Sequence, residues 1–172
     1  MKSVVRTPAR LLGLALALAP WFAWAGPSLH VEETLELSAP PAQVWATVGQ
    51  FGSLSWHPVV ATTQVNSSTP NQPGSERTVT VKDGAQIVEA LQAYDASQYT
   101  LTYRIVRSPL PVTGYVSTLR VLPSASGSKV VWSSDFERDA SVPNLNDAQA
   151  REVIAGIYTA GFDGLRTVFP SR

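Results

Sequence analysis

The chain has 172 residues with 13 basic and 13 acidic side chains, so its formal net charge is zero, and it contains no cysteine. The absence of cysteine excludes disulfides, thiolate chemistry and cysteine-ligated zinc or iron–sulfur sites. Removal of a leader that carries three of the basic residues would leave a mildly acidic chain with no basic stripe, which argues against nucleic acid as a partner.

Residues 1–25 have the features of a cleaved secretory signal peptide. Three basic residues precede the small and apolar run from Leu11 to Ala19, and Ala23-Trp24-Ala25 has the small-x-small form that signal peptidase accepts. The nine residues of this run are too few to cross a bilayer, which takes about 20. We therefore expect residues 26–172 to form the mature protein, a single domain with no membrane span.

The first element of the mature chain is predicted to be a strand from His30 to Ser38, because apolar and polar residues alternate there. Ala39-Pro40-Pro41 ends this strand, and residues 44–51 carry a short apolar stripe at helical spacing, after prolines that suit a first helical turn. A second short helix is predicted from Gly52 to His57. It should end before Pro58, since the residue that precedes a proline is disfavoured in the α region.

The remaining elements are six predicted strands and one long helix. Short, turn-rich connections between the strands favour an antiparallel meander. A helix is predicted from a cap within Asn144 to Asp147 as far as Phe169. The predicted fold is therefore α+β, a seven-stranded antiparallel sheet whose apolar face is covered by the long C-terminal helix. The six strands are Val59–Asn66, Ser75–Lys82, Gln86–Tyr94, Tyr99–Arg107, Val112–Leu122 and Lys129–Arg138.

The long helix contains three glycines, Gly156, Gly161 and Gly164. Each interior glycine costs about 0.5 to 1 kcal/mol of stability relative to alanine. Close approach of the helix to the sheet would explain them, and so would space left for a ligand. The sequence leaves both explanations open.

Four stretches, together with this element order, resemble a known superfamily. They are APPAQVW (39–45), FGSLSWHPVV (51–60), VEALQAYD (88–95) and LTYRI (101–105). They resemble the START-like, or Bet v 1-like, superfamily (SRPBCC) in its bacterial polyketide cyclase/dehydrase branch. The resemblance implies the helix-grip fold, in which a curved antiparallel sheet wraps a long C-terminal helix and leaves an apolar cavity between them.

A narrower similarity concerns LPVTGYVSTL (110–119), GIYTAGFDGL (156–165) and the signal-like leader. These stretches are similar to MxaD-type periplasmic proteins, which are associated with bacterial methanol oxidation. The similarity implies a periplasmic location and a role in assisting a quinoprotein alcohol dehydrogenase, with that enzyme or a cytochrome c as partner.

The superfamily comparison points one face of each strand towards the cavity. On the strand from Gln86 that face holds Ile87, Glu89, Leu91 and Ala93. Hydroxyl groups among aliphatic side chains are typical of a small-molecule pocket, although an ordinary core edge has the same composition. The predicted ligand-binding residues are Trp56, His57, Ile87, Glu89, Leu91, Tyr103, Ile105, Tyr115, Ser117, Trp132, Phe136, Val153, Ile157, Tyr158 and Gly161.

The last strand allows two registers. Val130, Trp132, Ser134 and Phe136 form its more apolar face, and we predict that this face points inward. In the other register, the inward residues are Val131, Ser133 and Asp135.

Two residues of the predicted pocket could carry chemistry. Glu89 would be a carboxylate in apolar surroundings, which raise a carboxyl pKa unless a partner compensates the charge. It could anchor a ligand or carry a proton, or it could form an ion pair with Arg104 or another strand arginine. His57 would end the second short helix, whose dipole favours the charged imidazole, and would shape the turn at the rim of the pocket.

The catalytic inventory of the sequence is small. No nucleophile motif, metal-binding histidine spacing or nucleotide-binding motif is present, so we predict no metal and no cofactor. The leading hypothesis is a non-enzymatic periplasmic protein that binds a small apolar or amphipathic molecule, docks on a periplasmic oxidoreductase, or does both. The alternatives are a cyclase- or dehydratase-type enzyme using Glu89 and His57, and an interaction protein whose own side chains fill the cavity.

Overall fold

The structure is a computed structural model that describes residues 28–170. The predicted signal peptide, residues 1–25, lies outside the described residues. Within the described part, no helix combines the length and the apolar character that crossing a bilayer requires.

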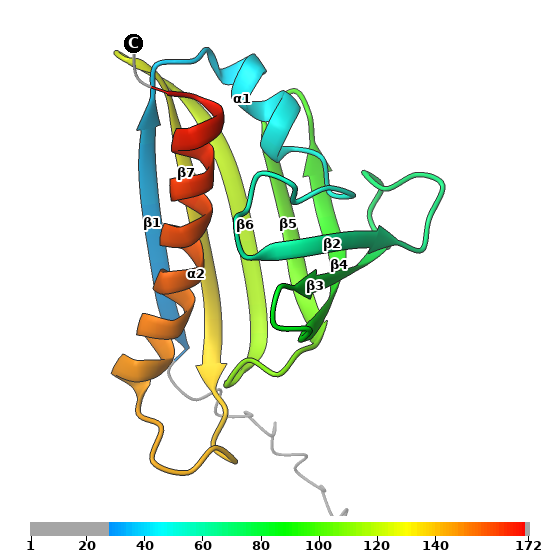
Figure 1. The fold of residues 1–172 in the computed structure, drawn as a ribbon, viewed down its shortest axis with the longest axis vertical. Coiled ribbons are helices and arrows are strands. Elements are labelled where there is room, and N and C mark those ends of the chain that lie inside the picture. The colour runs from blue at the N-terminus through cyan, green and yellow to red at the C-terminus, as the bar shows by residue number, and fades with distance from the viewer. Residues whose placement is uncertain (1–27, 171–172) are drawn as a thin grey trace, which may run out of the picture.

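The described chain forms one curved antiparallel sheet with two helices, which confirms the predicted α+β helix-grip class. The strands lie in the order β1-β7-β6-β5-β4-β3-β2. Helix α2, orange to red in Figure 1, lies along β1 and β7, whereas β3 and β2 lie at the opposite edge of the sheet and run across β4 and β5 in this view. The elements are β1 (Leu29–Leu37), α1 (Pro41–Val48), β2 (Val60–Val65), β3 (Glu76–Val81), β4 (Gln86–Asp95), β5 (Thr100–Arg107), β6 (Val112–Ser124), β7 (Gly127–Arg138) and α2 (Asp147–Val168).

The second short helix, predicted over Gly52 to His57, is absent from the described structure, and this prediction is wrong. The segment forms successive tight turns, in which Ser53 N donates to Gln50 O and His57 N donates to Leu54 O, both over 2.9 Å. Single turns of this kind do not propagate into a helix, because helix nucleation needs several consecutive bonds. Pro58, which has no backbone N–H, then interrupts the segment.

Two strands show how far alternation predicts side-chain direction. In β7 the predicted inward residues Trp132 and Phe136 are buried, whereas Ser133 is only partly buried and Asp135 is exposed, which confirms the chosen register. In β4 the register shifts between Leu91 and Ala93. This bulge leaves Ala93 exposed, contrary to the inward direction predicted for it, because an extra residue reverses the alternation beyond it.

Helix α2 begins with a capping box, and two of its glycines allow close packing against it. Asn146 and Gln149 cap its first turn reciprocally. A Cβ at Gly164 would collide with the Trp56 carbonyl oxygen, and one at Gly161 would lie 2.9 Å from the His57 ring. Close packing against the helix therefore explains these two glycines. The turn at residues 56–58 and the sheet residue Trp132 are the segments that pack there.

Candidate functional site

A cavity of about 650 Å³ lies between α2, the turn after α1 and the strands β3 to β5. This volume falls within the range of small-molecule sites, roughly 300 to 1,000 Å³. In the described structure the protein's own side chains leave this volume unfilled. Aliphatic side chains form most of its walls: Leu54, Val59, Val60, Val79, Val81, Ile87, Ile105, Leu110 and Ile157.

Eight of the fifteen residues predicted to bind ligand line this cavity. They lie on the turn after α1, on the inward faces of β4 to β7 and on one turn of α2, and they include both ionisable residues proposed for chemistry. The eight are His57, Ile87, Glu89, Tyr103, Ile105, Tyr115, Trp132 and Ile157.

Six other predicted residues are buried and do not belong to the residues that line this cavity. Tyr158 stacks on Trp132 at 4.4 Å between ring centroids, and Trp56 packs edge-on against the same indole at 5.7 Å. Both side chains are buried in the core. The six are Trp56, Leu91, Ser117, Phe136, Tyr158 and Gly161.

Val153, which was also predicted to bind ligand, does not line the cavity either. It is 37% exposed on α2, one residue before Ile154, which is 1% exposed. The helix buries the stripe that contains Ile154 and Tyr158, and Val153 lies outside that stripe.

The lining residues that sequence reasoning missed lie mostly on β3 and on two connections. Arg77, Val79 and Val81 alternate with polar residues along β3, so the period of two could have identified this inward face. Lys82, Asp83 and Ala85 follow in the next turn, and Pro109 and Leu110 lie between β5 and β6. Loop residues of this kind have no periodic pattern that predicts their position.

Glu89 is held by a buried ion pair. Its partner is Arg77, which lies opposite Glu89 where β3 pairs with β4. Arg77 Nε donates to Glu89 Oε2 over 2.6 Å. The same guanidinium donates from Nη1 to Phe51 O at 2.9 Å and lies 4.3 Å from the centroid of the Phe51 ring. The ion-pair alternative therefore holds with Arg77, whereas Arg104 is exposed.

His57 is buried, and its surroundings favour the neutral imidazole. Its Nε2 lies 3.0 Å from Ile157 O, and since a carbonyl only accepts, Nε2 carries the hydrogen. Its Nδ1 is buried and has no hydrogen-bond partner among residues 28–170. Burial lowers the pKa of His57, and the nearby Arg77 charge lowers it further, although the bond to Ile157 O acts in the opposite direction. The predicted preference for the charged form is wrong, because no helix ends at this residue.

A network of hydroxyl groups lies behind one wall of the cavity. Tyr115 and Tyr158 hydroxyls are 2.6 Å apart, and Tyr158 OH lies 3.2 Å from Ser117 Oγ. Burial raises the pKa of both tyrosines. Ser117 in turn donates to Ser133 O over 2.8 Å.

The indole of Trp132 joins this network to Tyr103. Its Nε1 donates to Ser117 Oγ over 3.0 Å and to Tyr103 OH over 3.1 Å. Burial, followed by the nearby Glu89 charge, raises the pKa of Tyr103. The three tyrosines are therefore neutral hydrogen-bonding groups at physiological pH.

The site contains no evident metal centre. Among residues 28–170, no group of three or more His, Asp or Glu side chains is arranged to hold a metal ion. The polar groups of the cavity instead form one ion pair, one imidazole and a set of hydroxyls, which suit the orientation of an organic molecule.

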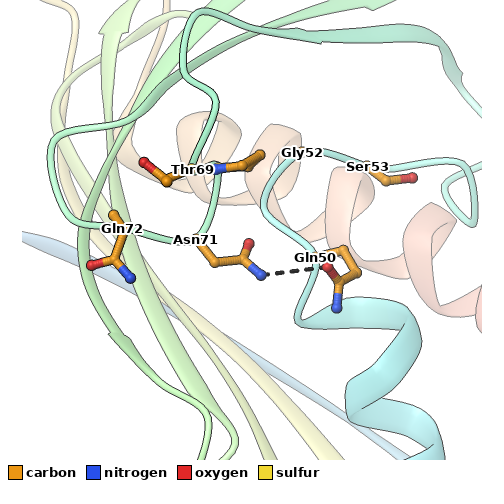
Figure 2. A pocket seen from close by; sticks show the side chains of 7 residues that line it. Gln50, Gly52, Ser53, Thr69, Asn71 and Gln72 are labelled. Atoms are coloured by element: carbon orange, nitrogen blue, oxygen red, sulfur yellow. Dashed lines mark hydrogen bonds between the residues drawn. The ribbon is translucent and has the colours of Figure 1, made fainter.

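A second, smaller hollow of about 370 Å³ lies beside the end of α1 (Figure 2). Asn71 ties its two sides together, because its Oδ1 accepts from Phe51 N at 2.9 Å and its Nδ2 donates to Gln50 Oε1 at 3.4 Å, the dashed line in Figure 2. Its lining carries no ionisable side chain. The residues are Gln50, Gly52, Ser53, Thr69, Pro70, Asn71 and Gln72.

Comparison with known proteins gives one family match and several relatives. Residues 28–170 match the family model described as "Polyketide cyclase / dehydrase and lipid transport". MLP-like protein 423 from Arabidopsis thaliana is 29% identical over 121 residues, and the alignment covers 65% of this chain and 77% of that protein.

Solved structures with the same fold come from several sources. XoxI from Bacillus cereus is 30% identical with a TM-score of 0.73, covering 82% of this chain and 95% of that one. An uncharacterised protein from Bacillus thuringiensis is 29% identical with a TM-score of 0.72, covering 83% and 99%. Ara h 8.0201, which is 21% identical with a TM-score of 0.62 and covers 82% and 99%, shares the fold.

Proposed function

We propose a function from one premise: the chain belongs to the polyketide cyclase / dehydrase and lipid transport family. The protein binds a small apolar or amphipathic molecule in the cavity and does not transform it. The observation that carries this proposal is the cavity itself, about 650 Å³ with mainly aliphatic walls and few polar groups. Such sites bind by burying apolar surface, while the polar groups orient the ligand.

The contacts of Glu89 and His57 favour binding over catalysis. An acid–base pair would need both side chains free to exchange protons with a substrate. Glu89 Oε2 is instead fixed by Arg77 at 2.6 Å, and His57 Nε2 is fixed by the backbone of α2 at 3.0 Å. Both groups therefore act first as structural and orienting residues.

We further propose that the mature protein acts in the periplasm and assists a quinoprotein alcohol dehydrogenase or its cytochrome c. Support comes from the signal-like residues 1–25 and from the MxaD-like stretches 110–119 and 156–165. These two stretches contribute Leu110, Tyr115 and Ile157 to the cavity lining. The two stretches therefore border the proposed ligand site.

The binding proposal is tested with Nile red, an uncharged dye whose emission rises in apolar surroundings. Ile105→Trp places an indole in the cavity, so the affinity for the dye should fall at least about tenfold. Val106→Trp is the matched control, because Val106 is the next residue of β5 and is 44% exposed. Absence of dye binding, or equal losses in the two variants, would contradict the cavity as the site.

The location and partner are tested separately. Fractionation of the source organism, with sequencing of the protein's N-terminus, should give a periplasmic chain that starts near Gly26. A chain that retains Met1 and stays in the cytoplasm would refute the location. Immobilised mature protein should retain a quinoprotein dehydrogenase or a cytochrome c from periplasmic extract, identified by mass spectrometry, and failure to retain either would refute the assisting role.

A further inference from the structure

The hydroxyl network has a fixed direction of hydrogen bonding. The hydrogen of Ser117 is used on Ser133 O, so Tyr158 must be the donor in its contact with Ser117 Oγ. The single hydrogen of Tyr158 is then committed, and Tyr115 must be the donor in the 2.6 Å contact between the two tyrosines. Tyr115 therefore has no hydrogen left for a ligand.

Tyr103 differs from Tyr115 in this respect. Its hydroxyl oxygen accepts from Trp132 Nε1. The neighbouring Ser117 Oγ already accepts from Trp132 and Tyr158, so both of its lone pairs are used, and among the described residues the hydrogen of Tyr103 has no free acceptor. Tyr103 is 3% exposed and lines the cavity. A buried donor without an acceptor is costly, and a ligand oxygen would remove that cost.

The charges beside Tyr103 compensate each other. The Arg77 guanidinium lies 5.1 Å from the centroid of the Tyr103 ring, and it is paired with Glu89. Among the described residues, Glu89 Oε1 accepts no hydrogen bond, whereas Oε2 accepts from Arg77. A ligand carboxylate would bring a second anion to Glu89, and a ligand ammonium a second cation to Arg77, in surroundings where an unpaired charge is strongly disfavoured.

We infer that the ligand has an uncharged polar end bearing a hydroxyl group, which accepts from Tyr103 OH and donates to Glu89 Oε1. The inference rests on the proposed function and names its ligand class: neutral amphipathic alcohols or phenols, in preference to fatty acids or amines. The apolar remainder of the ligand occupies the aliphatic part of the cavity near Ile87, Ile105 and Ile157.

Four fluorescent probes with one skeleton test the inference: pyrene, pyrenemethanol, pyrenecarboxylate and pyrenemethylammonium. At neutral pH the last two are charged. Anisotropy titrations should show pyrenemethanol binding at least about tenfold more tightly than either charged probe. If no probe binds, the proposed function fails. If the probes bind but a charged one matches pyrenemethanol, the inference alone fails.

Two conservative variants distinguish hydrogen bonding from a general preference for uncharged molecules. Tyr103→Phe should weaken pyrenemethanol about five- to tenfold, the loss of one hydrogen bond, and leave pyrene nearly unaffected. Trp132 Nε1 keeps its bond to Ser117 in this variant, so folding should survive, which thermal unfolding checks. Tyr115→Phe is the matched control: it should change the two affinities by the same factor. Equal selectivity losses in both variants would overturn the inference.

Glu89→Gln provides an independent test. The substituted side chain is uncharged and its amide oxygen still accepts from Arg77, so the guanidinium charge becomes uncompensated. The affinity ratio of pyrenecarboxylate to pyrenemethanol should then rise at least about tenfold. An unchanged ratio would mean that the ion pair does not determine which charge the cavity admits.

Discussion

Strands β7 and β4 carry similar inward faces in different surroundings. On β7, Trp132 stacks on Tyr158 of α2 at 4.4 Å, and Phe136 is 1% exposed. On β4, Ile87 and Glu89 face the cavity of about 650 Å³. We call β1, β7 and β6 (residues 29–37, 127–138 and 112–124) the packed half, and β3 to β5 (residues 76–81, 86–95 and 100–107) the cavity half.

The difference between the halves comes from their distance to α2. The helix contacts β1 and β7, while β3 and β2 lie at the opposite edge of the curved sheet (Figure 1). The inward side chain of Trp132 on β7 therefore packs on the helix and only borders the cavity, whereas Ile87 and Glu89 on β4 face unfilled volume. The turn at residues 56–58 contacts both halves. It packs closely against Gly161 and Gly164 of α2, and its His57 lines the cavity.

The largest predicted effect is a loss of stability when the buried ion pair of the cavity half is broken. Glu89→Ala leaves the Arg77 charge buried and unpaired and should lower the free energy of unfolding by about 3 to 5 kcal/mol. The double variant Glu89→Leu with Arg77→Leu should recover most of that loss, because it removes both charges. Urea denaturation measures both. A loss below about 1 kcal/mol in Glu89→Ala would mean that the pair is solvated and the cavity half is open to water.

A smaller effect is expected where the turn seats on α2. Gly164→Ala should destabilise by about 1 to 3 kcal/mol, because its Cβ collides with the Trp56 carbonyl. Gly156→Ala is the matched control. Gly156 is exposed with nothing near its Cβ position, so this change should stabilise by about 0.5 to 1 kcal/mol. Urea denaturation measures both changes in the free energy of unfolding. Equal changes in the two variants would rule out close packing of the turn against Gly164.

The smallest predicted effect is a pH dependence carried by His57. Its pKa is lowered on folding from the ordinary 6.5, so below that pH the unfolded chain binds a proton that the folded chain does not. His57 therefore contributes stability that is present above pH 6.5 and is lost as pH falls through the lower, folded pKa. Urea denaturation in mildly acidic and neutral buffer should show this loss.

Two histidine variants identify the residue responsible. His57→Gln should remove the stability loss between neutral and mildly acidic pH, and His30→Gln should retain it. His30 is the suitable control because it is an exposed residue paired with Asp135 on the surface of the sheet. A loss that disappears in His30→Gln and persists in His57→Gln would contradict the assignment.

Sequence periodicity predicted the fold and the direction of most strand side chains, because burial of one sheet face imposes a period of two. It did not predict how far α2 lies from each strand. Ser117, Phe136 and Tyr158 consequently entered the same predicted pocket as Ile87 and Ile105, although only the last two line the cavity.

Local features account for the other differences. The bulge after Leu91 inserts one residue and reverses the alternation for Ala93, which no composition rule announces. Arg77 was missed although its spacing with Val79 marked an inward face. Its pairing with Glu89 becomes evident only once β3 and β4 are aligned.

The distinction between the halves is tested most directly by methyl NMR, because the chain has four isoleucines. Ile87, Ile105 and Ile157 line the cavity, and Ile154 lies in the core at 1% exposure. On titration with pyrenemethanol, ring currents should shift the δ1 methyl signals of the three cavity isoleucines and leave that of Ile154 in place. A shift confined to Ile154, or no shift at saturating probe, would contradict the assignment of the cavity as the ligand site.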